Sequence, residues 1–129
     1  MTTKKRTTVQ KTEIRKAFED AEHPITPQDA WERAREGVPK LGMATVYRTV
    51  KELLEEGDLH KVEVSGQAPH YELADKGHHH HFACRVCSRV FDIHGCPGNM
   101  GRIVPEGFVA EYHEITVHGI CAECQMKTA

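Results

Sequence analysis

The sequence predicts an α+β protein in which three helices and a β-hairpin come first and a smaller α/β unit with a structural zinc follows. Apolar residues recur at helical spacing up to Leu54, and after Gly57 they alternate as in strands. The chain has 129 residues, which is enough for one domain or two small ones. Two Cys-x-x-Cys pairs lie in the second part, Cys84 with Cys87 and Cys121 with Cys124.

The first two helices are predicted from apolar spacing and from their end signals. Residues 14–21 place isoleucine, alanine and phenylalanine on one helical face, and the pattern ends at His23-Pro24, since the residue before a proline avoids the helical conformation. The stretch TPQD at 26–29 supplies an N-cap threonine, a proline at the first helical position and an acidic first turn. We expect this second helix to end at Gly37.

The third helix and the hairpin complete the first unit. Residues 43–57, MATVYRTVKELLEEG, combine one apolar stripe with a terminal glycine stop. The stripe consists of Val46, Val50, Leu53 and Leu54. Residues 59–64 and 68–73 then alternate as two strands, with Ser-Gly-Gln at 65–67 as the turn. Three helices followed by a hairpin is the order of a winged helix, whose third helix enters the major groove of DNA.

The charge distribution agrees with a nucleic-acid partner for the first half. The net charge is only −2, but residues 1–51 hold 11 Lys and Arg against 7 Asp and Glu, whereas residues 52–129 hold 6 against 12. No stretch reaches the roughly 18 to 20 apolar residues of a membrane span. The basic start runs into a charged helix rather than a signal-peptide core, so we expect a cytoplasmic protein without a membrane partner.

The second unit is predicted to be rich in strands. Residues 74–77, ADKG, are interpreted as a short hinge. HHFAC at 80–84 and RVFDI at 89–93 indicate a hairpin with a Cys-x-x-Cys at its tip, and residues 108–120 indicate one or two further strands. Residues 97–107 hold at most one short helix. A unit of about 50 residues has little apolar core, and metal or oligomerisation would stabilise it.

The cysteine pairs supply a metal site of that kind. In a reducing compartment, cysteines are better candidates for metal than for disulfides. Each pair has the two-residue gap that presents two thiolates to one ion, so Cys84, Cys87, Cys121 and Cys124 are predicted to bind a structural zinc. With 33 residues between the pairs, we expect a strand-helix-strand insert between them.

Four consecutive histidines, His78 to His81, precede the first cysteine pair. Successive side chains of a strand point to opposite faces, so His78 and His80 would face one way and His79 and His81 the other. One strand can therefore supply an imidazole pair to each of two metal sites.

Together these residues resemble the ferric uptake regulator (Fur) family of bacterial metal-dependent repressors. The resemblance rests on ATVYRTVKELLEEG in the third helix, on HHHHFACRVC, and on His113 followed by the last cysteine pair, and it runs from about Ile14 to Cys124. It implies a winged-helix DNA-binding domain at 1–73, a hinge at 74–77 and a metal-binding dimerisation domain at 78–129. It also implies a homodimer on an inverted-repeat operator and no enzymatic activity or small-molecule substrate.

The resemblance further implies a regulatory metal site that uses ligands from both domains. These ligands would be His23, Glu72, His79, His81 and Asp92. An imidazole and carboxylate shell suits Fe(II), Mn(II) or Zn(II). No cysteine lies just before the histidine run, which speaks against the zinc-sensing branch. Asp92, where many iron sensors carry Glu, resembles the peroxide-sensing branch. We therefore rank iron and peroxide sensing together, ahead of manganese and zinc.

A second site implied by the resemblance would use His78, His80 and His113, and here the sequence departs from the family. The glutamate that the family usually supplies falls near Asn99, in a segment about three residues shorter than usual. Three local residues are candidates for the fourth ligand: Cys96, Glu106 and His94.

DNA contact is expected on the exposed face of the third helix. Tyr47 and Arg48 match the family's Tyr-Arg pair, and arginine can reach a guanine edge or a phosphate. The expected phosphate contacts come from Thr45 and Lys51 and from a leading arm with Lys4, Lys5 and Arg6.

Two other functions use similar residues. A zinc hydrolase needs an open metal position and a general base, yet the sequence has no His-Glu-x-x-His helix. A metal-buffering protein has no use for a winged helix with an exposed Tyr-Arg pair.

Overall fold

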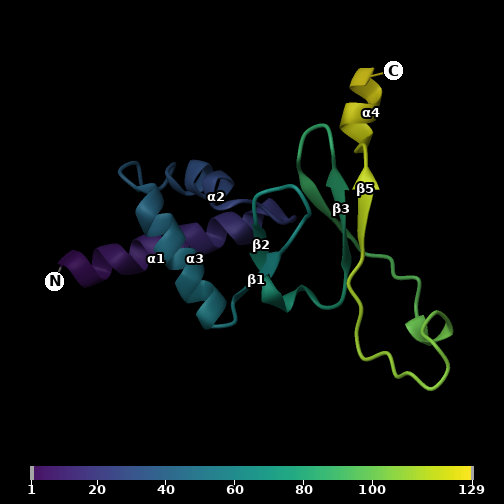
Figure 1. The fold of residues 1–129 in the computed structure, drawn as a ribbon. Helices are drawn as coiled ribbons and strands as arrows, with labels where there is room; N and C mark the ends of the chain where they lie inside the picture. Colours follow the sequence, from purple (N-terminus) through teal and green to yellow (C-terminus); the bar gives the residue numbers. More distant parts are fainter. Residues whose placement is uncertain (1, 129) are drawn as a thin grey trace. The chain divides into compact units, whose positions relative to one another are not determined.

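The first unit combines α1 (Thr2–Ala21), α2 (Pro27–Ala34) and α3 (Met43–Glu55) with a hairpin of β1 (Leu59–Val62) and β2 (His70–Leu73). The computed structural model describes residues 2–128, with side chains over residues 8–127. The chain divides into two compact units after Gly77, and Figure 1 shows the elements of each. The predicted winged-helix order is confirmed.

Local signals in the sequence determine where these helices begin and end. Thr26 caps α2, accepting a hydrogen bond from the Asp29 backbone at 3.1 Å, while the Asp29 carboxylate accepts from the Thr26 backbone at 3.2 Å. α2 ends at Ala34, slightly before the predicted Gly37. After α3, Gly57 adopts φ +80°, a left-handed conformation that suits glycine at a helix end.

The core of the first unit lies between the three helices and the hairpin. Its fully buried side chains include Ile14 and Phe18 of α1 and Val46 and Leu53 of α3. β1 and β2 pair antiparallel, and Ile25 forms a further bridge to Tyr71 with N···O distances of 3.0 and 2.8 Å. This bridge fixes the segment after α1 beside β2.

The first helix is longer than its apolar pattern predicts. It starts at Thr2, so Lys4, Lys5 and Arg6 belong to α1 rather than to a separate arm, and their side chains lie outside the described ones. Ion pairs join α1 to the end of α3 and the following turn. Lys11 pairs with Glu52 at 3.5 Å and also with Glu56, and Arg15 pairs with Asp58 at 3.6 Å.

The second unit is built on a three-stranded sheet of order β4-β3-β5, with β3 (His80–Cys84), β4 (Val90–Ile93) and β5 (Thr116–Gly119). β3 and β4 form the predicted antiparallel hairpin, whereas β5 runs parallel to β3. A long connection between β4 and β5, seen in green to yellow in Figure 1, contains the 3-10 turn η2 (Met100–Arg102).

The segment between the cysteine pairs contains one of the one or two strands and the one short helix predicted for it. Of residues 108–120, β5 alone is a strand in the described chain, and Phe108, Val109 and Tyr112 ahead of it are exposed. The short helix of the insert is the 3-10 turn η2. In addition, the last cysteine pair begins a helix that apolar spacing did not predict, α4 (Ala122–Thr128).

A 3-10 turn η1 (Ala74–Lys76) and Gly77, with φ +74°, occupy the segment interpreted as a hinge. No described helix has both the length and the apolarity that crossing a membrane requires.

Candidate metal centres

Four cysteine thiols meet where the hairpin tip and the start of α4 lie together. Cys84 ends β3 and Cys87 lies in the turn to β4, whereas Cys121 directly precedes α4 and Cys124 lies in its first turn. Their sulfur atoms all lie within 4.8 Å of one another. The turn closes through a 3.0 Å hydrogen bond from the Ser88 N–H to the Cys84 carbonyl.

The spacing of the thiols fits tetrahedral zinc. The Cys87 and Cys121 sulfurs are 3.9 Å apart. Two thiolates on one zinc lie about 3.8 Å apart when each Zn–S bond is about 2.3 Å. The Cys121 N–H also donates to the Cys84 sulfur at 3.3 Å, as expected for a thiolate in a metal-binding turn. A four-sulfur set is the donor chemistry of a closed structural zinc site.

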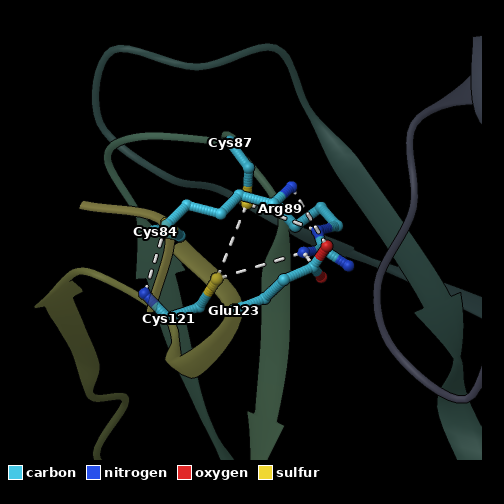
Figure 2. Close-up of polar contacts among 6 residues, drawn as sticks. Cys84, Cys87, Arg89, Cys121 and Glu123 are labelled. Atoms are coloured by element: carbon cyan, nitrogen blue, oxygen red, sulfur yellow. Dashed lines mark hydrogen bonds and ion pairs between the residues drawn. The ribbon is translucent and has the colours of Figure 1, made fainter. Parts of the chain in front are cut away.

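Arg89 lies against this thiol cluster, as Figure 2 shows. Its Nε donates to the Cys87 sulfur at 3.3 Å, and its Nη2 lies 4.0 Å from the Cys121 sulfur. The same nitrogen is 2.6 Å from a carboxylate oxygen of Glu123. Glu123 therefore holds the guanidinium beside two of the sulfurs.

The surroundings of the thiols shift their pKa values in different directions. Backbone N–H groups of Cys87 and Cys121 lower the pKa of Cys84 to about 6. Burial raises the pKa of Cys87, but hydrogen bonds from the Arg89 side chain and backbone outweigh it, and the net shift is downward. Burial, together with hydrogen bonds to the other thiols, raises the pKa of Cys124 to about 12. A divalent cation would relieve this crowding of ionisable sulfurs.

One face of the histidine run meets a carboxylate of β4. His81 and Asp92 are direct partners in the β3–β4 register. The Nε2 atoms of His79 and His81 lie 3.4 and 3.6 Å from the same Asp92 oxygen, and the two rings are 4.8 Å apart. The structure thus brings together three of the five residues predicted for the regulatory site, all from the second unit.

The other two belong to the first unit and have partners there. Glu72 on β2 is 2.9 Å from the Nε2 of His60 and 3.5 Å from the ammonium of Lys76. The His23 Nδ1 lies 3.0 Å from the Pro24 carbonyl, in the loop that the Ile25–Tyr71 bridge fixes to β2. His60 has no motif spacing of its own, so its place beside Glu72 could not be predicted from the sequence.

The opposite face of the run forms a separate cluster. His78, His80, His113 and Cys96 have their ligand atoms within 4.8 Å of one another. Burial, with the neighbouring imidazoles, lowers the pKa of His80, which favours the neutral form that binds metals. Of the three candidates for a fourth ligand, the structure brings Cys96 here. In the part of the chain that the structure describes, Glu106 and His94 are not members of this cluster.

The exposed face of α3 holds the residues expected to contact DNA. Val46, Val50 and Leu53 are buried, whereas Tyr47 is 58% exposed and Arg48 and Lys51 are exposed. Arg48 donates to the Thr45 hydroxyl at 3.2 Å. This hydrogen bond holds the guanidinium on the solvent side of the helix.

Comparison with known proteins identifies the family. The model of the ferric uptake regulator family matches residues 2–118. The ferric uptake regulation protein of Bacillus subtilis is 30% identical over 120 residues, which cover 88% of this chain and 80% of that protein.

Solved structures agree on the fold. The Helicobacter pylori ferric uptake regulator matches with a TM-score of 0.76 at 22% identity, covering 90% of this chain and 79% of that one. A zinc-bound manganese uptake regulator matches with a TM-score of 0.77 at 25% identity, covering 87% of each chain. The chain therefore belongs to the ferric uptake regulator family, whose members regulate transcription and are not enzymes.

Proposed function

We propose that this chain is a metal-dependent repressor that binds an inverted-repeat operator as a homodimer when a divalent metal fills its regulatory site. The observation that supports this most is the group of two imidazoles and one carboxylate from His79, His81 and Asp92. His23 and Glu72 are proposed to complete the site from the first unit. Metal would then fix the arrangement of the two units.

The donor set argues against a thiolate-dependent zinc sensor. Imidazole and carboxylate ligands suit Fe(II), Mn(II) and Zn(II), and the proposed ligands include no sulfur. The Bacillus subtilis relative named above is a ferric uptake regulation protein, which favours Fe(II). Asp92 in place of the more usual Glu favours a peroxide sensor. We therefore propose iron or peroxide sensing ahead of manganese or zinc sensing.

DNA recognition is proposed for the exposed face of α3. Tyr47 and Arg48 would reach base edges or the backbone, and Thr45 and Lys51 would bind phosphates. A single winged helix reads too few base pairs for genomic specificity. A homodimer through the second units would present two α3 helices to successive major grooves.

Before metal binds, the proposed ligands already have polar partners. Glu72 accepts from Lys76 and lies against His60. Asp92 lies between His79 and His81, whose Nε2 atoms it holds near one point. When bound, the metal supplies positive charge that the carboxylates would offset, and the neutral imidazoles would complete its ligand shell. On metal binding, Glu72 would exchange its contacts with His60 and Lys76 for a contact with the metal. Metal binding would thereby change the contacts within the first unit.

The test is DNA affinity with and without metal. The metal-loaded protein, purified without oxygen, would first select duplexes from a random pool, and the selected duplex would serve as the probe. We expect binding to it to be at least about 100-fold tighter with Fe(II) or Mn(II) than in chelator and to weaken with salt, since phosphate contacts release counterions. Equal affinity with and without each metal would contradict the proposal.

Iron sensing and peroxide sensing differ in the fate of the site histidines. Fe(II)-loaded protein would be treated with hydrogen peroxide and digested for mass spectrometry. A peroxide sensor would gain one oxygen atom on a site histidine and lose DNA binding. An iron sensor would stay unmodified at the same dose, and the Mn(II)-loaded protein is the control for both.

A further inference from the structure

We propose that Cys96 is the fourth ligand of a tetrahedral zinc site with His78, His80 and His113. The site would be separate from both the four-sulfur cluster and the regulatory site. Its thiolate would make it select Zn(II) over Fe(II) and Mn(II), because sulfur ligands favour zinc over the harder ions. The inference concerns metal content and does not depend on the proposed DNA function.

The distances between the four ligand atoms match a tetrahedron around one ion. The Cys96 sulfur lies 3.4, 3.5 and 3.3 Å from the Nε2 atoms of His80, His78 and His113. The Nε2 atoms of His80 and His113 are 3.2 Å apart. A zinc ion with ordinary bond lengths separates a sulfur and a nitrogen ligand by about 3.6 Å and two nitrogen ligands by about 3.3 Å.

The backbone around Cys96 has the form of a metal-binding turn. The Gly98 N–H donates to the Cys96 sulfur at 3.4 Å. Gly98 has φ +96°, which glycine adopts without strain. In this conformation its N–H points back to the Cys96 sulfur. The Cys121 N–H donates to Cys84 in the same way in the four-sulfur cluster. N–H donors of this kind stabilise a thiolate.

Glu106 and His94, the other two candidates for the fourth ligand, have different surroundings from Cys96. Glu106 and His94 are exposed, and neither is within the group of convergent ligand atoms found among the described residues. In contrast, the imidazole rings of His78, His80 and His113 are in mutual contact, with centroids 4.6 to 4.9 Å apart. Cys96 is the residue that completes this group.

Zinc at this site would restrict the connection between β4 and β5. Cys96 and His113 lie at the two ends of the connection between β4 and β5, whose described regular structure is the turn η2. Inside that connection Ile103, Phe108 and Val109 are 78, 68 and 84% exposed. Zinc would tie both ends to the start of β3, and so restrict a segment with exposed apolar side chains. Because Cys96 and His78 are themselves exposed, this zinc should exchange faster than the one in the buried four-sulfur site.

The test compares metal content and Co(II) spectra of the full chain. We expect Cys96→Ser to lose one equivalent of zinc and to retain the four-sulfur zinc. In the Co(II)-loaded protein it should lose the thiolate charge-transfer absorption of one sulfur. His94→Ala and Glu106→Gln are matched controls and should keep both zinc equivalents and the full spectrum. Cys96→His should regain zinc but not the lost absorption.

Two results would overturn the inference. One is Cys96→Ser protein with unchanged zinc content and an unchanged Co(II) spectrum. The other is loss of the second zinc in His94→Ala or Glu106→Gln, which would assign the ligand to that residue. His78→Ala tests the same site from the strand and should match Cys96→Ser in metal content. Circular dichroism and the retained four-sulfur zinc show whether each variant is folded.

Discussion

At the scale of single residues, Arg89 shows how one side chain supports a metal site without being a ligand. Four thiolates around Zn²⁺ carry two excess negative charges, and a cation beside them offsets part of that charge. Arg89 donates to the Cys87 sulfur and is held there by Glu123. It also lies over the Phe91 ring at 5.3 Å, so its position is fixed from a second side.

We expect Arg89→Ala to speed the release of zinc from the four-sulfur site by about 10-fold or more, because outer contacts of metal ligands commonly affect affinity on that scale. The measurement is the rate of transfer of zinc to a chromogenic chelator. Arg85→Ala removes the same charge from an exposed position in the same hairpin and is the control. Equal rates of zinc release for the two variants would mean that the contact between Arg89 and the thiols does not help to retain the zinc.

Arg48 supports a second prediction at this scale. If it contacts a base, Arg48→Ala should weaken operator binding by about 1 to 3 kcal/mol and relax preference at one base position. Arg35→Ala removes an equal charge from the first unit, where its guanidinium stacks on Trp31 at 4.3 Å, and should leave the base preference unchanged. Competition binding with single-base variants of the selected duplex measures both effects. Unchanged affinity and base preference in Arg48→Ala would show that Arg48 does not contact the operator.

At the scale of elements, the sequence predicts those parts of the fold whose signals are local. The Thr26 cap, the buried stripe of α3 and the β3–β4 hairpin all depend on residues close in sequence, and the structure has them. The alternation of the histidine run likewise follows from strand geometry alone. Residues 108–115 have strand-like composition, but a strand also needs a partner, which a local pattern does not contain.

The same limit explains which site residues the sequence could not single out. Cys96 is separated from His80 by a strand and a turn, so its choice over Glu106 and His94 depends on the path of the chain. Arg89 follows Cys87 closely, yet its role depends on Glu123 in α4, far along the sequence. α4 is too short for apolar spacing to reveal, and Cys121 before it and Cys124 within it attach it to the hairpin.

The attachment of α4 to the hairpin through the four-sulfur zinc should be needed for the second unit to fold. Cys121→Ser should lose the four-sulfur zinc and leave the second unit unfolded, because the binding energy of a structural zinc is largely folding energy in so small a unit. Hydrogen exchange should show loss of protection in β3, β4 and β5 while α1 and α3 stay protected. A Cys121→Ser protein that lacks this zinc but keeps the sheet protected would contradict a structural role.

At the scale of the whole molecule, the proposed regulation depends on two units and one hinge. Each unit has its own core, and the chain between β2 and β3 is short, with a 3-10 turn and a glycine at φ +74°. A metal can shift the arrangement of the units only by its differential affinity for the alternatives. Ligands from both units are what would give the metal that differential affinity.

The two faces of the histidine run should differ in their effect on DNA binding. A regulatory response of about 100-fold corresponds to about 2.7 kcal/mol of coupling between metal and DNA. His23→Ala should abolish most of this coupling and leave the fold, the dimer and the four-sulfur zinc intact, because it removes a ligand contributed by the first unit only. His78→Ala, on the other face, should affect the Cys96 site instead and reduce regulation less. The measurement is operator affinity with and without Fe(II) or Mn(II) for both variants. If His23→Ala keeps full metal dependence and His78→Ala loses it, the regulatory role belongs to the face with His78, His80 and His113.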